Sequence, residues 1–331
     1  MQILQTQAAR NFAVLGAVGI GIALLFAVDP AGASARAMHF LGTRVDVLHG
    51  QAVFIAGLAM VIALEVVWTG YAESSLARLL RPSRSAWIDI ACFILMQFGL
   101  YGALTYVFSF SAASVLPRFL HDHLPAGLFH LDSPWLQFFW LMLAMDFTRY
   151  WIHFFQHKLG FWWEAHAFHH CATEMNVITT TRAHPLDQAV QLILLAIPTT
   201  LLGGSMLDFF VLNLAMAMHA GLTHSMLPWN FGWLGRWVLY SPIGHRIHHS
   251  DLPEHHDKNL GSVFVFWDRL FGTWYAGPVV NQTVGLEHNI YNRNGLLSDF
   301  VTCALRFYGA VLATLRRPFA GLNQSLFRRP R

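Results

Sequence analysis

Long apolar segments with almost no charged residues constrain this chain most strongly. Charged residues make up only 12% of its 331 residues, whereas a soluble globular protein carries roughly a quarter. A helix needs about 17 to 25 apolar residues to cross a bilayer. Four segments approach that length, namely Phe12 to Val28, Ala52 to Trp68, Ala86 to Phe110 and Trp135 to Phe155. We therefore expect an integral membrane protein and not a cytosolic enzyme.

Two shorter apolar segments follow, from Ala189 to Gly204 and from Met206 to Leu222. The residues Gly203, Gly204 and Ser205 leave room only for a tight turn between them. This pattern predicts a helical hairpin that crosses the membrane or dips partway into it. Together the segments predict an all-α membrane bundle of about four spanning helices plus the hairpin.

The distribution of Lys and Arg indicates the orientation, because cytoplasmic loops are enriched in these residues. A cytoplasmic N-terminus would place most of the 21 basic residues on one face, including Arg10, the arginines near Arg81 and the C-terminal tail. The first apolar segment could instead be a secretory signal, since Arg10 precedes it and small residues from Ala31 to Ala35 follow. A retained anchor gives the same orientation downstream. Both interpretations place all the clustered histidines on the cytoplasmic side.

Three histidine clusters are the clearest indication of chemistry. His166, His169 and His170 form an H-x-x-H-H pattern, and the same pattern recurs at His245, His248 and His249. On a helix this spacing puts the imidazoles on one face, where they can converge on one point. One helical turn separates a further pair upstream, His153 and His157.

Eight clustered imidazoles are too many for one metal ion and suggest two ions with four or five nitrogen ligands each. Imidazole binds iron, zinc, copper and nickel, and affinity alone does not choose among them. The paired Glu-x-x-His motifs of carboxylate di-iron bundles do not occur in this sequence. The predicted site is therefore rich in nitrogen. His224, at the end of the hairpin, returns to the same face and could provide a ninth ligand.

Other residues could bind the metals or hold the ligating rings, since such rings usually donate their second N–H to a carboxylate or carbonyl. Glu164 and Asp268 are local candidates for holding the rings, and Cys171 is either a ligand or a small buried neighbour. The remaining candidates for either role are His184, His219, Asp146, Asp257 and Asn259.

The region from residue 1 to 133 is expected to be a membrane anchor without chemistry of its own. Glu65 and Asp89 lie within its apolar segments, where acids are costly and often functional, but each is close enough to a span end or bundle interior for a structural role. The isolated histidines of this region are expected to be solvated or interfacial, namely His39, His49, His121, His123 and His130.

The catalytic segment is expected to span residues 134 to 285. The remainder, 286 to 331, contains an apolar stretch from Leu296 to Leu315 that suits an amphipathic interfacial helix. The basic tail from Phe327 to Arg331 is expected to be attracted to anionic lipid. The three widely spaced cysteines contain no C-x-x-C pair, so neither a disulfide framework nor a zinc ribbon is indicated.

The ordered set of histidine clusters, followed by Asn259-Leu-Gly261 and the segment from Trp267 to Thr273, resembles the fatty acid hydroxylase and sterol desaturase superfamily. The similarity covers about Trp135 to Tyr275. Leu260 stands where the family usually has Tyr. The resemblance implies an O₂-dependent di-iron membrane enzyme with a cap of histidines over a helical bundle. It also implies that the clustered histidines and His224 ligate two iron ions.

The resemblance implies hydroxylation or desaturation of an unactivated C–H bond in a lipid, a reaction that side chains cannot perform without a metal cofactor. Sterol, fatty acyl chain, sphingoid base, carotenoid and alkyl ether lipid all remain compatible. The sequence contains no G-x-G-x-x-G nucleotide fingerprint and no iron–sulfur cysteine set. Electrons are therefore expected from a separate ferredoxin, cytochrome or reductase that docks on the basic cytoplasmic face.

Two other functions use the same residues. A zinc-dependent membrane hydrolase or isomerase would need only three protein ligands and an open position, which is fewer than this chain offers. A non-enzymatic metal-binding or transport protein would place ionisable residues near the bilayer midplane, whereas these histidines lie beyond the ends of the predicted spans. A layer of histidines that merely caps helices would not need two clusters of the same form.

Overall fold

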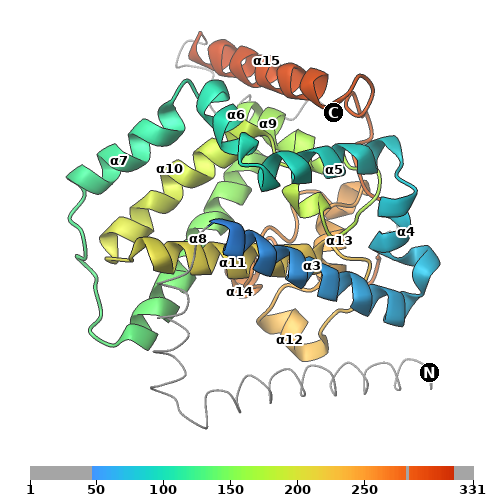
Figure 1. Ribbon diagram of the computed structural model, residues 1–331, viewed down its shortest axis with the longest axis horizontal. Helices are drawn as coiled ribbons and strands as arrows, with labels where there is room; N and C mark the ends of the chain where they lie inside the picture. Colours follow the sequence, from blue (N-terminus) through green and yellow to red (C-terminus); the bar gives the residue numbers. More distant parts are fainter. Residues whose placement is uncertain (1–46, 281–282, 317–331) are drawn as a thin grey trace.

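The computed structural model describes residues 47–280 and 283–316, and its regular elements are helical (Figure 1). Within these residues β-structure is limited to two isolated bridges, Leu239 with Phe264 and Ser250 with Val284. The all-α prediction is thus confirmed for the described chain. The α-helices are α3 (Val47–Thr69), α4 (Ser75–Leu80), α5 (Arg84–Gln97), α6 (Leu100–Phe108), α7 (Ala112–His123), α8 (Pro134–Lys158), α9 (Gly160–His170), α10 (Pro185–Leu201), α11 (Met206–Thr223), α12 (Gly232–Trp237), α13 (Pro242–His248), α14 (Phe266–Leu270) and α15 (Leu296–Leu315).

Several expectations fall outside the described residues. The first apolar segment, Phe12 to Val28, lies there together with its flanking Arg10 and the small residues that follow it, and so do His39 and the tail from Phe327 to Arg331. The anchor-or-signal question and the role of the tail therefore stay open predictions.

Two of the described helices have the length and composition to cross a membrane, α3 from Gly50 to Thr69 and α15. The segment Ala86 to Phe110, predicted as one span, is instead two helices, α5 and α6, bent by 97° at a short break. Gly99 at this break has a φ of 70°, a left-handed conformation that glycine adopts without a Cβ clash and that ends a helix. The apolar pattern alone does not reveal this bend.

The helix α8 contains the predicted span Trp135 to Phe155 within one unbroken element of 25 residues. It does not meet the hydropathy expected of a span, because Asp146, Arg149 and several indole and phenol side chains lie within it. The count of four straight spans thus remains a prediction. The predicted interfacial helix coincides with α15, which is also long and apolar enough to span, so its placement is a prediction too.

The two helices of the predicted hairpin are present as α10 and α11, joined by the short turn from Leu202 to Ser205. Ser205 and Asp208 form a reciprocal capping box that starts α11, and Gly203 takes a φ of 70° in the turn. The two helices diverge from the turn and do not pack along each other. α10 packs mainly on α6, α7 and α8, whereas α11 packs on α3 and α13.

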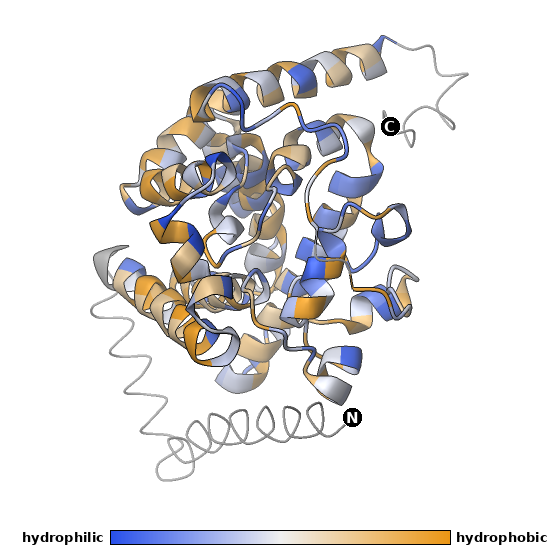
Figure 2. Cartoon of the chain, turned by 90° about the vertical axis from the view of Figure 1, so that its right-hand side faces the viewer, coloured by the Kyte–Doolittle hydropathy of each residue, from blue (hydrophilic) through white to orange (hydrophobic). Residues whose placement is uncertain are grey.

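Short helices follow the longer ones along the chain. Of these, α13 packs on α11, and the long helix α15 packs along α9 (Figure 1). Hydrophilic residues gather on the right of Figure 2, whereas apolar residues dominate the helices on its left. This distribution fits a protein with a membrane-facing side and a solvated side.

Buried polar contacts connect the predicted anchor region to the residues that follow it. The Glu65 carboxylate on α3 accepts hydrogen bonds from the backbone N–H groups of Ser75 and Met226, and from the Ser75 hydroxyl. The structural interpretation of Glu65 is thereby favoured over a functional one. The Tyr101 hydroxyl on α6 donates to the carbonyl of Ala183. The anchor therefore packs into the catalytic segment, and the predicted domain boundaries mark sequence segments whose residues contact one another.

Candidate metal centre

Four helix ends bring the clustered histidines to one place. The last turns of α8 carry His153 and His157, and Leu159 turns the chain at once into α9, which packs back on α8 and ends with the second cluster. The short helix α13, started by its N-cap Ser241, carries the third cluster into the same volume. His224 is the C-cap residue of α11.

The structure divides the nine predicted ligands into two adjacent groups. One group has five histidines and the other four, and within each group one ring nitrogen per residue lies within 4.8 Å of all the others. The groups touch, since the ring centroids of His170 and His249 are 4.5 Å apart. The five-histidine group consists of His153, His157, His166, His170 and His248, and the four-histidine group of His169, His224, His245 and His249.

Backbone carbonyls hold many of these rings from behind. The Nδ1 of His153 lies 2.8 Å from the carbonyl oxygen of Leu260, that of His169 lies 2.8 Å from Arg182, and that of His248 lies 2.9 Å from Lys258. An Nδ1–H that donates to a carbonyl fixes the tautomer, so the lone pair is on Nε2. The ligating nitrogens therefore face the interior of each group.

The interior nitrogens fit a metal centre. Among the described residues, the Nε2 atoms of His153, His170 and His248 are buried without a hydrogen-bond partner. In the four-histidine group, Nε2 atoms face one another at 3.0 to 3.4 Å. A neutral ring whose Nδ1 carries the hydrogen has none on Nε2, so two such Nε2 atoms cannot hydrogen-bond to each other. Buried polar atoms are costly unless something satisfies them. A metal ion in each group would accept all of these lone pairs.

Two carboxylates complete the support of the five-histidine group. The Nδ1 of His166 donates to Asp187 at 3.2 Å, and Asp187 also accepts from the side-chain amide of Gln156. The Nδ1 of His157 lies 3.5 Å from Asp257, whose other oxygen pairs with Lys158 at 2.9 Å. Such carboxylates orient a ligating ring and raise its basicity.

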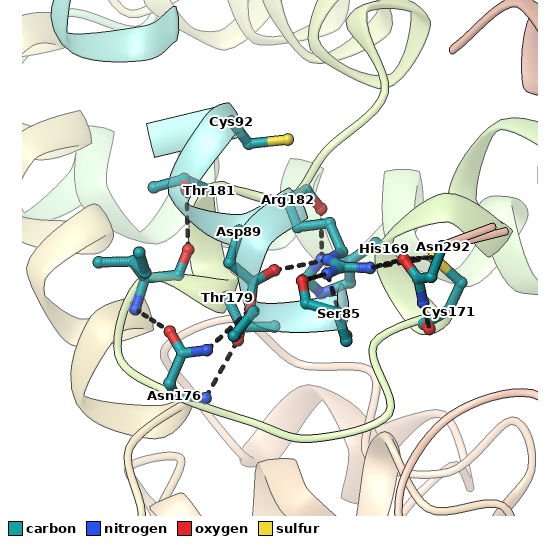
Figure 3. A network of polar contacts seen from close by, with 12 residues as sticks. Ser85, Asp89, Cys92, His169, Cys171, Asn176, Thr179, Thr181, Arg182 and Asn292 are labelled. Carbon is teal, nitrogen blue, oxygen red and sulfur yellow. Dashed lines mark hydrogen bonds and ion pairs between the residues drawn. The ribbon is translucent and has the colours of Figure 1, made fainter. Parts of the chain in front are cut away.

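A buried ion pair fixes the carbonyl that holds His169 (Figure 3). The Arg182 guanidinium donates to Asp89 on α5 at 2.5 Å, and both side chains are fully buried. Arg182 also donates to Ser85 and to Asn292, while Asp89 accepts from Thr179. Asp89 therefore has a structural role, and the anchor region helps to position a predicted ligand.

The loop after the third cluster is held in the same manner. The Asp268 carboxylate accepts from the backbone N–H groups of Leu260 and Gly261, which fixes the carbonyl that binds His153. The Asn259 side chain donates to the carbonyl of Gly244, next to His245. Asn259 and Asp268 thus position backbone and do not join either histidine group, and Leu260 contributes its carbonyl where the family usually has Tyr.

Burial keeps the clustered rings neutral. Loss of solvation lowers the pKa of His169 from 6.5 to about 4, with a further contribution from His166. Burial, followed by neighbouring imidazoles, also lowers the pKa of His170, His245 and His249 well below the usual value. Neutral imidazole is the form that ligates metal.

Three further candidates lie apart from both groups. His184 caps the start of α10 with Nδ1 and donates from Nε2 to the carbonyl of Phe300, so both its ring nitrogens are engaged. His219 donates to the carbonyl of Tyr240. Asp146 accepts from the backbone of Val263 and Phe264 and from an indole N–H.

The structure also places the other residues that the sequence singled out. Glu164 lies outside both histidine groups and pairs with Arg306 at 2.6 Å. Cys171 is fully buried and lies outside both histidine groups, as expected of a small neighbour. His121, His123 and His130 are exposed, as a solvated or an interfacial position requires, while the side chain of His49 is not described.

The sequence reasoning missed Asp187 and Arg182. Asp187 lies in the first turn of α10, where an acid is commonly explained by the helix dipole alone. Its position three residues after His184, at the start of the apolar helix that follows the second cluster, was an available signal. For Arg182 the functional contact is made by a backbone carbonyl, which no residue pattern indicates.

A cavity of about 500 Å³ leads to the histidines. It lies between α8 and the diverging helices α10 and α11, which is the consequence of the open hairpin. Apolar side chains such as Leu195, Phe209 and Met216 line one part, and His153, His166 and His245 line another. A hydrocarbon chain could thus approach the metal centre without crossing water.

Residues 138–273 match the family model described as "Fatty acid hydroxylase". An alkylglycerol monooxygenase of Caenorhabditis elegans is 34% identical over 148 residues, which are 44% of this chain and 28% of that protein. The human alkylglycerol monooxygenase is 33% identical over 174 residues, covering 49% and 36%. An ornithine lipid hydroxylase of Rhizobium tropici is 31% identical over 142 residues, covering 43% of each chain. No solved structure gives a significant match.

This segment therefore belongs to the fatty acid hydroxylase and sterol desaturase superfamily, as the histidine motifs indicate. The matched segment includes every histidine of the two groups. The chain spans less than half of the length of these relatives.

Replacing Asp187 by Asn should weaken metal binding about 10- to 100-fold, because the His166 ring loses the carboxyl group that accepts from its Nδ1. Metal content after dialysis against graded chelator measures the effect. Asp208→Asn, in the exposed capping box of α11, is the matched control and should retain metal as the wild type does. Equal loss in both variants, or none in either, would contradict the assigned role of Asp187.

Lowering the pH should release metal and destabilise the fold. In the unfolded chain His169 has its ordinary pKa of 6.5 and takes up a proton as the pH falls below that value. In the folded chain its pKa is lowered to about 4, so the ring resists protonation until the pH approaches 4. Stability is therefore fully present above 6.5 and is lost as the pH falls toward 4, and protons also compete with metal for the same nitrogens. Thermal unfolding and metal content, followed in detergent from pH 7.5 to 4.5, should decline together. A flat or rising melting temperature over this range would oppose the account.

Proposed function

We propose that the chain is a membrane-bound, O₂-dependent di-iron enzyme that hydroxylates an unactivated C–H bond of a lipid. The observation that carries this proposal is the pair of adjacent histidine groups, members of which line a largely apolar cavity. The cavity walls suit a hydrocarbon substrate. The superfamily of residues 138–273 and the names of the relatives support a lipid-modifying oxygenase.

The five-histidine group would hold one ion and the four-histidine group the other. Nitrogen ligands accept several first-row transition metals, and the donor set alone does not select iron; the superfamily favours it. Two bound iron ions would supply the activation of dioxygen that side chains cannot provide. In the overall reaction one oxygen atom enters the C–H bond and the other leaves as water, using two electrons and two protons from a donor.

The residues of this chain would act by orientation and by exclusion of water. Backbone carbonyls and the carboxylates of Asp187 and Asp257 hold the rings in the ligating tautomer. Leu195, Phe209 and Met216 line the approach and would keep the hydrocarbon in a dry environment. Preorganised ligands of this kind require no rearrangement when substrate enters.

Hydroxylation is favoured over desaturation by the relatives, whose names describe a monooxygenase and a hydroxylase. The electrons would come from a separate ferredoxin, cytochrome or reductase. Basic residues are expected to dominate the face that docks it, and an acidic donor would be steered there. We place this face, and with it the metal centre of a multi-pass protein, on the cytoplasmic side.

A catalytic zinc site is less well supported, because it needs about three protein ligands. Here each group offers more than three converging nitrogens.

Replacing His248 by Ala should remove one ligand from the five-histidine group, and replacing His169 by Ala should remove one from the four-histidine group. Product formation should fall by at least about 100-fold, since loss of the residues that merely orient ligands already costs 10- to 100-fold, and bound iron should decrease in parallel. Lipid extracts from reactions run under labelled dioxygen report incorporation of one oxygen atom, and elemental analysis reports iron. His123→Ala changes an exposed histidine and serves as the control. Zinc in place of iron, or turnover unchanged in either variant, would refute the proposal.

A further inference from the structure

Arg149 is a charged residue in the wall of the cavity. It lies on the face of α8 that also presents Ile152, His153 and Gln156 to the cavity, at the spacing of successive helical turns. An ionisable residue within an apolar helix of a membrane protein is costly and usually functional. Arg149 belongs to neither histidine group, so the metal centre described above does not account for its presence.

The guanidinium of Arg149 is held by two uncharged side chains. Nη1 donates to the amide oxygen of Gln191 on α10 at 2.6 Å, and Nη2 donates to that of Asn213 on α11 at 2.5 Å. Both amides also line the cavity. The Nε atom is buried and has no hydrogen-bond partner in the part of the chain that the structure describes. The side chain is therefore fixed in place with donor capacity to spare.

Within the described residues, no carboxylate forms an ion pair with Arg149 at 4.0 Å or less. Asp146 is three residues earlier on α8, but its two oxygens accept three N–H groups of the segment from Val263 to Trp267. Amide oxygens satisfy hydrogen bonds without neutralising the guanidinium, which remains protonated in proteins.

We infer that Arg149, Gln191 and Asn213 form a subsite that binds the carboxylate or phosphate of the lipid substrate. This inference rests on the proposed function, since it treats the cavity as the substrate chamber. The guanidinium presents planar donors that match an oxyanion. Charge pairing in a dry cavity would offset the cost of burying both groups, which the amides alone do not.

The position of the subsite restricts which carbon reacts. Arg149 precedes His153 by one turn of α8, and Gln191 follows Asp187 by one turn of α10, so the subsite lies on the order of 6–10 Å from the histidines. A lipid anchored there presents carbons close to its charged group to the metal centre. The enzyme then oxidises near the polar end of the lipid and not at the far end of a long acyl chain.

A purely structural Arg149, which only ties α8 to α10 and α11, makes a different prediction. Its removal would lower stability without altering the preference between charged and neutral ligands. Binding of matched lipid pairs separates the two roles, because each pair shares its hydrocarbon chain and differs in charge.

The experiment measures dissociation constants by intrinsic tryptophan fluorescence in uncharged detergent at pH 7.5, with iron content recorded for every sample. The probes are N-palmitoylglycine against its neutral amide, palmitoyl lysophosphatidic acid against monopalmitoylglycerol, and inorganic phosphate. The proteins are the full-length wild type, Arg149→Gln, Arg149→Lys and Arg118→Gln. Arg118 is exposed on α7 and controls for general attraction of anionic lipid.

The wild type and Arg118→Gln should bind one or both charged lipids about 10- to 100-fold more tightly than the neutral partners, as expected for hydrogen bonds to a charged group. Arg149→Gln should lose this preference while its affinity for the neutral lipids is unchanged, and Arg149→Lys should keep part of it. Unaltered iron content and neutral-lipid binding show that the variants are folded.

Equal affinity of the wild type for charged and neutral partners, or a preference that survives in Arg149→Gln, would overturn the inference. Binding of inorganic phosphate through Arg149 without any preference among the lipids would overturn it as well, because the site would then serve a free anion. The readout needs no turnover. Absence of iron with the lipid preference intact would count against the proposed function alone.

Discussion

The structure depends on keeping nine imidazole rings neutral and aimed inward within one dry volume. A ring can offer Nε2 to a metal only when Nδ1 carries the hydrogen, so each ring needs an acceptor behind it. Carbonyls of Leu260, Arg182 and Lys258 serve three of the rings, and carboxylates support two others. Much of the structure around the histidines serves to hold those acceptors in place.

This constraint explains why residues far from the histidines are buried and charged. Arg182 and Asp89 form a buried pair, which contributes little net stability by itself, but the pair fixes a carbonyl that faces His169 (Figure 3). Asp268 does the same for the carbonyl of Leu260 through backbone contacts. In both cases a charged side chain is used to position backbone, and the backbone positions a ring.

The spacing of the histidines was sufficient to predict that they gather in one place, because i, i+3 and i+4 positions share a helix face whatever the rest of the fold does. It did not predict that each H-x-x-H-H cluster is divided between the two groups, with His169 apart from His166 and His170. His248 is likewise apart from His245 and His249. His224 was found by its position after a hairpin. The bend at Gly99 and the divergence of α10 from α11 were not predictable from apolar runs, since both depend on where long helices pack. The partner of His166 was missed because Asp187 makes that contact across a change of helix, which local patterns do not encode.

The divergence of α10 and α11 is the feature that connects the metal centre to a substrate, because it leaves the cavity open between them and α8. The most direct test of the central claim is the position of metal in the folded protein. Anomalous diffraction recorded at the iron absorption edge should show two iron peaks per chain, one among the five histidines and one among the four. A single peak, or peaks that appear at the zinc edge and not at the iron edge, would contradict the account.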